Sequence, residues 1–166
     1  MKVKEAAKKV VSKLGDIFKR FELSEIALSP TEFNITISYQ NYDKEAAWLM
    51  YVELLTRVTT QKLEEGTGDE KTALDSIYSL FASTRQVLRE KGRKAINFTK
   101  ISVIILNKVI RPFTAKWHKE SLGGAFEKLD KCNEFRNELE NLRISLLKYS
   151  RILAEMAGVE DMSFML

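Results

Sequence analysis

Apolar side chains recur at steps of three and four residues along most of the chain, and this spacing predicts amphipathic helices around a shared core. The clearest case covers residues 125–157, where the two steps alternate as they do in the contact seam of packed helices. The apolar positions of this seam are Phe135, Leu139, Leu142, Leu146, Tyr149, Leu153 and Met156. Gly158 follows directly and is a natural end for the helix.

The same spacing predicts three earlier helices, over residues 43–64, 69–91 and 97–117. Glycine-containing segments separate them, and Thr67 or Asp69 is suited to cap the second helix. Because the connections are short and polar, consecutive helices are expected to run antiparallel. The sequence therefore predicts a mainly α fold, organised as an up-and-down four-helix bundle.

The N-terminal region has a different pattern. An amphipathic helix is predicted over residues 2–21, and we expect its apolar side to pack on the domain rather than on a membrane. Apolar and polar residues then alternate, which predicts one short β-hairpin over residues 23–39. We expect a single domain over residues 1–166, with an appendage at 1–41, the bundle at 42–158 and a tail at 159–166.

The most apolar stretch of the chain runs from Lys100 to His118. Its predicted core positions are Ile101, Ile105, Val109 and Phe113, with Trp117 one turn further on. A separate polar stripe is predicted at Asn107, Arg111, Thr114 and His118. Pro112 cannot donate a hydrogen bond to the carbonyl oxygen of Lys108, so we expect the helix to kink or restart there.

The spacing Arg111-x6-His118 resembles the R-x4–6-H motif of HEPN ribonucleases, which are small helical domains that often dimerise over RNA. The resemblance implies that His118 assists proton transfer at the 2′-hydroxyl and that Arg111 holds the scissile phosphate. In those enzymes the residue after the arginine is usually small or polar, whereas here it is Pro112. The alternative is that His118 is an exposed residue at a helix end and Arg111 a surface or paired arginine.

A second group of polar residues, Glu53, Arg57, Asp75 and Arg85, is expected to form a structural network. Glu53 and Arg57 are four residues apart, which suits an ion pair on one helix face. Arg85 falls within the apolar stripe of the second helix, so its guanidinium must reach the surface or an acid.

The net charge of +4 is unevenly distributed. Residues 84–119 contain ten lysines and arginines but only one acid, Glu90. This asymmetry is typical either of a surface that binds an anionic partner such as RNA, or of surfaces that pair within a complex. The candidates for nucleic-acid contact are Arg89, Arg93, Lys94, Lys100 and Lys116.

The sequence contains no signature of several other kinds of chemistry. The one cysteine, Cys132, excludes an internal disulfide and suits a reducing cytoplasm, where we expect the protein to be located. The chain contains a single histidine and no glycine-rich phosphate loop, so we expect no metal and no cofactor. The longest apolar run is too short and too polar to span a bilayer.

Residues 73–81 and 106–118 resemble stretches of uncharacterised bacterial proteins associated with anti-phage defence loci. We interpret the chain as a non-catalytic helical subunit or self-associating module of a bacterial assembly, with a protein partner or a second copy of itself. One alternative is a metal-independent, HEPN-like ribonuclease that uses Arg111 and His118. Another is a module that binds nucleic acid without cleaving it.

Overall fold

The computed structural model describes residues 39–57, 60–64 and 66–165, and all regular structure within these ranges is helical. The α-helices are α2 (Asn41–Leu55), α3 (Glu70–Lys91), α4 (Ile96–Ile104), α5 (Arg111–Leu122) and α6 (Leu129–Ala157). The short elements are the 3-10 turns η2 (Gly92–Lys94), η4 (Ala125–Glu127) and η5 (Ser163–Met165), and the π-helical segment η3 (Ile105–Ile110). The mainly α class is confirmed. The helix predicted at 2–21 and the hairpin predicted at 23–39 lie outside the described residues, apart from Tyr39.

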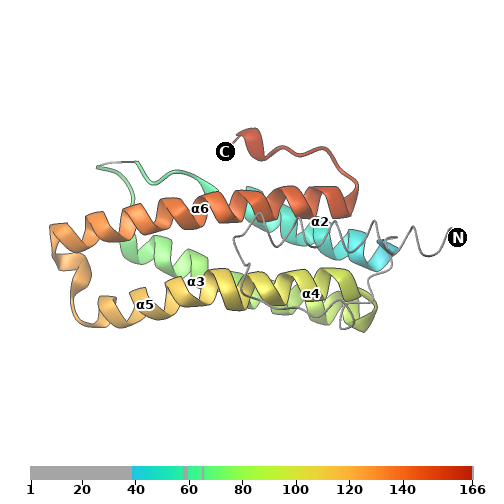
Figure 1. The fold of residues 1–166 in the computed structure, drawn as a ribbon, viewed down its shortest axis with the longest axis horizontal. Helices are drawn as coiled ribbons and strands as arrows, with labels where there is room; N and C mark the ends of the chain where they lie inside the picture. The colour runs from blue at the N-terminus through green and yellow to red at the C-terminus, as the bar shows by residue number, and fades with distance from the viewer. Residues whose placement is uncertain (1–38, 58–59, 65, 166) are drawn as a thin grey trace, which may run out of the picture.

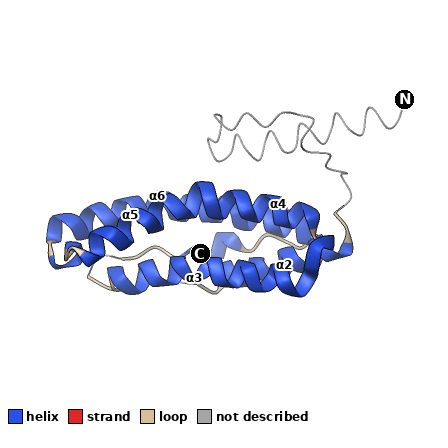
Figure 2. Cartoon of the chain, turned by 90° about the horizontal axis from the view of Figure 1, so that it is seen from below, coloured by secondary structure: helices blue, strands red, loops and turns tan. Residues whose placement is uncertain are grey.

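The helices lie along the long axis of the molecule, and α2, α3, α4–α5 and α6 each run opposite to the segment before (Figure 1). A perpendicular view separates two layers, one formed by α4–α5 with α6 and the other by α2 with α3 (Figure 2). The apolar core fills the space between the layers. All seven positions of the predicted α6 seam are buried in it, so that prediction is confirmed.

An aromatic cluster closes the end of the core where α5 turns into α6. Trp117 is fully buried, and its ring stacks on Phe126 with 6.0 Å between centroids. The same indole meets Phe135 edge-on at 5.0 Å. Its Nε1 donates a hydrogen bond of 2.9 Å to Glu138 Oε2 on α6, so the polar atom of the tryptophan is satisfied at the rim of the core.

Three predicted helix boundaries were wrong, and one of them is the end of the third helix, which runs to Leu122 rather than to residue 117. The first helix ends at Leu55 rather than near residue 64, with Thr56 as its C-cap, and the buried Thr60 hydroxyl donates to the carbonyl of Leu54 at 2.6 Å. The last helix begins at Leu129 rather than at residue 125, since Ala125–Glu127 form only a 3-10 turn and Lys128 after it is extended. An α-helix cannot continue through an extended residue.

The predicted ends of the other helices are close to those observed. Of the two candidate caps, Asp69 is the one that caps α3, and its side chain accepts the backbone N–H of Thr72 at 2.7 Å. Gly92 and Gly158 follow α3 and α6 with positive φ values of +66° and +73°. These are conformations that glycine adopts without strain.

At Pro112 the α-helical geometry restarts, as expected, because α5 begins at Arg111 with the proline in its first turn, directly after a wider helical segment. The chain is helical without interruption from Ile96 to Leu122, and residues 105–110 form the π-helical segment η3. A wider turn gives the proline ring room beside the preceding carbonyls, where an α-helix would clash. At the end of this segment Ile110 is buried, while Val109, the predicted core position, is only half-buried; Phe113 and Trp117 are buried as predicted.

Candidate functional site

His118 lies where α5 crosses α3, at the surface of the molecule. Its ring meets Tyr78 edge-on with 4.8 Å between centroids, and its Nε2 is 4.0 Å from Asp75 Oδ1. One third of its side chain remains exposed. The histidine is therefore held against α3 by an aromatic ring and a carboxylate.

Arg111 occupies the same face of α5, two turns earlier. Its guanidinium lies over the ring of Phe81, 5.0 Å from the centroid, and its Nε donates a hydrogen bond of 2.9 Å to Asn107 Oδ1. Both arrangements are typical of an arginine that covers apolar surface while its charge stays in water. Within the described residues no carboxylate pairs with it.

Arg111 and His118 do not converge on a common point within one chain. Seven residues separate them, which corresponds to about 10 Å along a helix axis. Each has its own aromatic partner on α3, and the rings of Tyr78 and Phe81 are 5.7 Å apart. This arrangement favours the interpretation of both residues as surface residues of the α3–α5 contact.

Thr114 was expected on the polar stripe but is almost fully buried, with 3% of its surface exposed. Its hydroxyl bonds to the carbonyl oxygens of Ile110 and Arg111, both at 3.2 Å. The cause is the π-helical segment η3, which turns this position towards the core. The expected stripe is thereby reduced to Asn107, Arg111 and His118.

Glu53 and Arg57 form the predicted ion pair, and the structure extends it across to α3. The guanidinium of Arg57 also donates to the hydroxyls of Ser79 and Ser83. Ser83 in turn donates to Glu53 Oε2 at 3.1 Å. These hydrogen bonds, chiefly those from Arg57, hold the pKa of Glu53 below its ordinary value.

The other two members of the predicted network do not join this pair. Asp75 lies further along α3, where Lys71 Nζ is 2.5 Å from its Oδ1 and His118 faces it. Arg85 is exposed, so its guanidinium has reached the surface. The sequence did contain the signal for the actual partners, because Ser76, Ser79 and Ser83 recur at helical spacing on one face of α3.

The basic candidates differ in how far their charge is compensated. Lys116 Nζ is 2.8 Å from Glu134 Oε1 and 2.5 Å from Glu138 Oε1, and these hydrogen bonds raise its pKa. Its charge is therefore neutralised by α6 and is not available to a ligand. The exposed candidates are Arg89, Arg93 and Lys94, while Lys100 is half-buried; Lys94 Nζ lies 5.0 Å from the centroid of the Tyr42 ring.

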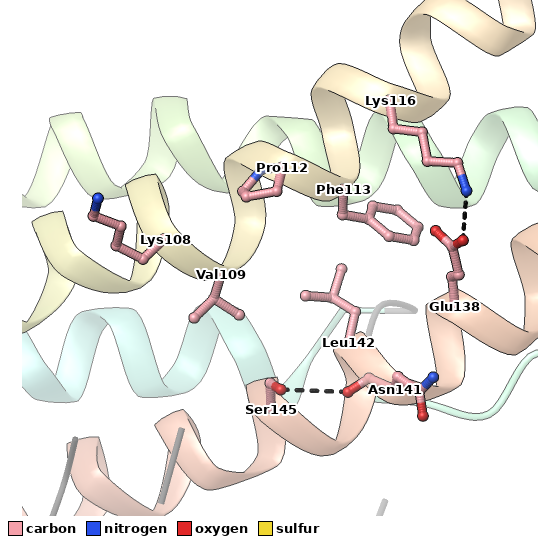
Figure 3. Close-up of a pocket in the computed structure, with 9 residues that line it drawn as sticks. All are labelled: Lys108, Val109, Pro112, Phe113, Lys116, Glu138, Asn141, Leu142 and Ser145. Atoms are coloured by element: carbon pink, nitrogen blue, oxygen red, sulfur yellow. Dashed lines mark hydrogen bonds and ion pairs between the residues drawn. The ribbon is translucent and has the colours of Figure 1, made fainter. Parts of the chain in front are cut away.

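A hollow of about 440 Å³ lies where α6 passes the start of α5 at Pro112 (Figure 3). Val109, Phe113 and Leu142 form its apolar floor, and the Lys116–Glu138 ion pair lies at one end. The remaining lining residues are Lys108, Pro112, Asn141 and Ser145. Lys116 and Glu138 pair with each other, and the lining is mainly apolar, with Lys108 as a further cation.

A second hollow, of about 770 Å³, lies between the chain at 61–64 and α6. It is polar, and its two arginines already have partners. Arg136 Nε is 2.7 Å from Glu70 Oε1, and Arg143 Nη2 is 2.8 Å from Glu140 Oε1. Arg136 therefore links α6 to α3, and Arg143 forms an ion pair within α6.

Residues 39–57, 60–64 and 66–165 contain no group of three His, Cys, Asp or Glu side chains that could hold a metal ion. No helix among them has both the length and the apolar character needed to cross a bilayer. Burial raises the pKa of the Cys132 thiol, which contacts the carbonyl oxygen of Phe126 at 3.4 Å. The thiol thus stays protonated near neutral pH and is a poor nucleophile.

Comparisons of the chain with protein-family models, curated proteins and solved structures gave no match. The function is therefore inferred from the geometry of the molecule alone.

Proposed function

We propose that this chain is a non-catalytic helical module that works by self-association, with an up-and-down four-helix bundle as its scaffold. We also propose a cytoplasmic location, which the single cysteine Cys132 supports. The partners of Arg111 and His118 support the non-catalytic part of the proposal, because each side chain is engaged separately on α3.

The observation that carries the proposal is a group of exposed apolar side chains on α2 and on the C-terminal tail. Trp48 and Val52 lie one turn apart on the outer side of α2, with exposed fractions of 42% and 37%. Phe164 and Met165 in the tail are more exposed still, at 77% and 74%. We call these four residues the α2–tail surface.

The tail is fastened to α2 rather than extending away from it. The hydroxyl of Tyr51 accepts the backbone N–H of Met162 at 2.6 Å, and the ring of Trp48 lies 6.2 Å from that of Tyr51. Asp161 adds a second connection, since its carboxylate is 3.6 Å from the guanidinium of Arg151 on α6. Exposed large apolar side chains on two segments that a hydrogen bond joins are typical of a protein–protein contact.

A second copy of the chain would remove these side chains from water, and burial of apolar surface stabilises by roughly 25 cal/mol per Å². Multi-angle light scattering over a range of protein concentrations tests the proposal. We expect the wild type to form dimers or larger assemblies, and Trp48→Ser combined with Phe164→Ser to be monomeric. The matched control is Leu122→Ser, a residue that is 91% exposed and lies at the end of α5.

Two results would contradict self-association. One is a wild type that stays monomeric at all concentrations. The other is an equal loss of assembly in the Leu122→Ser control, which would show that exposed apolar surface in general, rather than the α2–tail surface, causes the association. Circular dichroism of each variant establishes that the helical content is unchanged.

A further inference from the structure

We propose that the face formed by α3 and α4–α5 binds single-stranded nucleic acid, with Arg85, Arg89 and Arg111 contacting phosphates and Tyr78 stacking on a base. We call these four residues the basic face. They lie on different helices from the α2–tail surface, so this proposal does not depend on self-association.

The register of the two antiparallel helices brings these residues onto one surface. His118 faces Tyr78, and Arg111 lies over Phe81, one turn further along α3. Because α3 and α4–α5 run antiparallel, Arg85 and Arg89 lie further along α3, towards its junction with α4 (Figure 1). Because Tyr78 and Arg85 are seven residues apart, they share one side of α3, and both are exposed.

The positive charge of this face has little compensation, since Asp75, the acid that faces His118, is paired with Lys71 at 2.5 Å. Between residues 76 and 119 the chain holds ten lysines and arginines and one acid, Glu90. Among the ten, Lys91 pairs with Glu45 at 3.0 Å and Lys116 with two glutamates of α6. In the described part of the chain no carboxylate pairs with the three arginines of the basic face.

Glu90 accepts a hydrogen bond of 2.8 Å from Gln86 Nε2, and its single negative charge leaves this stretch of the chain strongly positive. A row of exposed arginines with few acids nearby attracts a polyanion, and binding releases the counterions condensed on it. The planar guanidinium matches the geometry of phosphate oxygens, so arginine suits this contact better than lysine does.

Tyr78 makes a single strand a better partner than a duplex or an acidic peptide. Its ring is 52% exposed, with the His118 ring packed against it and Phe81 beside it. Unpaired bases stack on aromatic rings held in this way, whereas the bases of a duplex are already stacked on each other. Tyr78 and Arg89 are eleven residues apart, or about 16 Å along the helix, which is enough for a few nucleotides.

Fluorescence anisotropy with labelled oligouridylate and oligodeoxythymidylate of about 12 nucleotides, titrated at several salt concentrations, tests this inference. We expect the full chain to bind at least one of the two, and the comparison shows whether RNA or DNA is preferred. The logarithm of the binding constant should fall with the logarithm of the salt concentration, with a slope of about −0.7 for each phosphate contact.

The double variant Arg85→Glu/Arg89→Glu removes two of these contacts, so the slope should become shallower by about 1.4 and binding at low salt should weaken. Its control, Lys62→Glu/Lys128→Glu, makes the same change of charge at exposed lysines elsewhere and should bind almost as the wild type does. Tyr78→Ala should weaken binding about fivefold or more without changing the slope, because a stacking contact rather than a charge is lost.

Three outcomes would overturn the inference: no binding at low salt, an equal loss in the lysine control, or unchanged affinity in Tyr78→Ala. Polyglutamate or a duplex that competes as well as the single strand would likewise overturn it, since the face would then respond to charge alone. Light scattering on the arginine variant separates this inference from the proposed function, because that variant should still self-associate.

Discussion

Asp43 on the first turn of α2 serves as the cap of another helix, through its contact with Asn97 at the start of α4. Its Oδ1 accepts the backbone N–H groups of Asn97 and Phe98 at 2.9 and 3.0 Å, and its Oδ2 accepts the side-chain amide of Asn97 at 2.9 Å. The residue before α4, Ala95, has no polar side chain with which to cap it. One carboxylate with 1% of its surface exposed thus fixes the start of α4 against α2.

Replacing Asp43 by alanine should therefore destabilise the fold by about 3 kcal/mol, because two buried N–H groups lose their acceptor. The measurement is the free energy of unfolding from urea denaturation followed by circular dichroism. Asp75→Ala is the matched control, since Asp75 is exposed and should contribute less than about 0.5 kcal/mol. Similar losses in both variants would contradict the capping role.

The contact between Asp43 and Asn97 also marks the limit of what the sequence predicts. The α6 seam and the Asp69 cap depend on residues close together in the chain, so spacing alone identifies them. The contact between Asp43 and Asn97 spans 54 residues and depends on how two helices lie relative to each other, which periodicity does not determine.

Some features of the candidate site can likewise be predicted from the sequence, and others cannot. The pairing of Glu53 with Arg57 follows from their spacing on one helix. The partners of His118 on α3 could not be predicted, because they depend on the register between α3 and α5. The burial of Thr114 was missed for a third reason: the π-helical segment η3 adds a residue to the turn, and an α-helical period does not anticipate it.

Ser102 and Tyr149 form a buried hydroxyl pair at 2.8 Å between α4 and α6, and burial raises the pKa of the tyrosine. Either single variant, Ser102→Ala or Tyr149→Phe, should cost about 1–2 kcal/mol because one hydroxyl loses its partner. The double variant should cost clearly less than the sum, since neither unpaired group remains. Urea denaturation of all four proteins completes the cycle, and strictly additive losses would show that the two hydroxyls are not coupled.

Glu134 connects α6 to α5 through Lys116, and the hydrogen bonds from Lys116 and Lys131 lower its pKa from 4.5 to about 2. A carboxylate whose pKa is lower in the folded protein stabilises the fold above its unfolded pKa, and this contribution disappears as the pH falls through the folded value. The stability difference between the wild type and Glu134→Gln should therefore be constant above about pH 4.5 and shrink towards about pH 2.

Thermal unfolding across this pH range measures the Glu134 effect, with Glu127→Gln as the control because Glu127 is exposed and lies outside the ion pairs of the α5–α6 contact. The control difference should be small at every pH. If the Glu134→Gln difference instead persists unchanged in acid, its hydrogen bonds to the two lysines do not contribute through ionisation.

The separate partners of Arg111 and His118 lead to a prediction about RNA. Total RNA incubated with the wild type should stay intact, because His118 faces Tyr78 and Asp75 while Arg111 lies two turns away over Phe81. His118→Ala and Arg111→Ala, analysed in parallel by gel electrophoresis, should behave identically to the wild type. Cleavage by the wild type that both substitutions abolish would contradict the non-catalytic proposal and favour a HEPN-like ribonuclease, whereas cleavage that persists in both variants would indicate a contaminating nuclease.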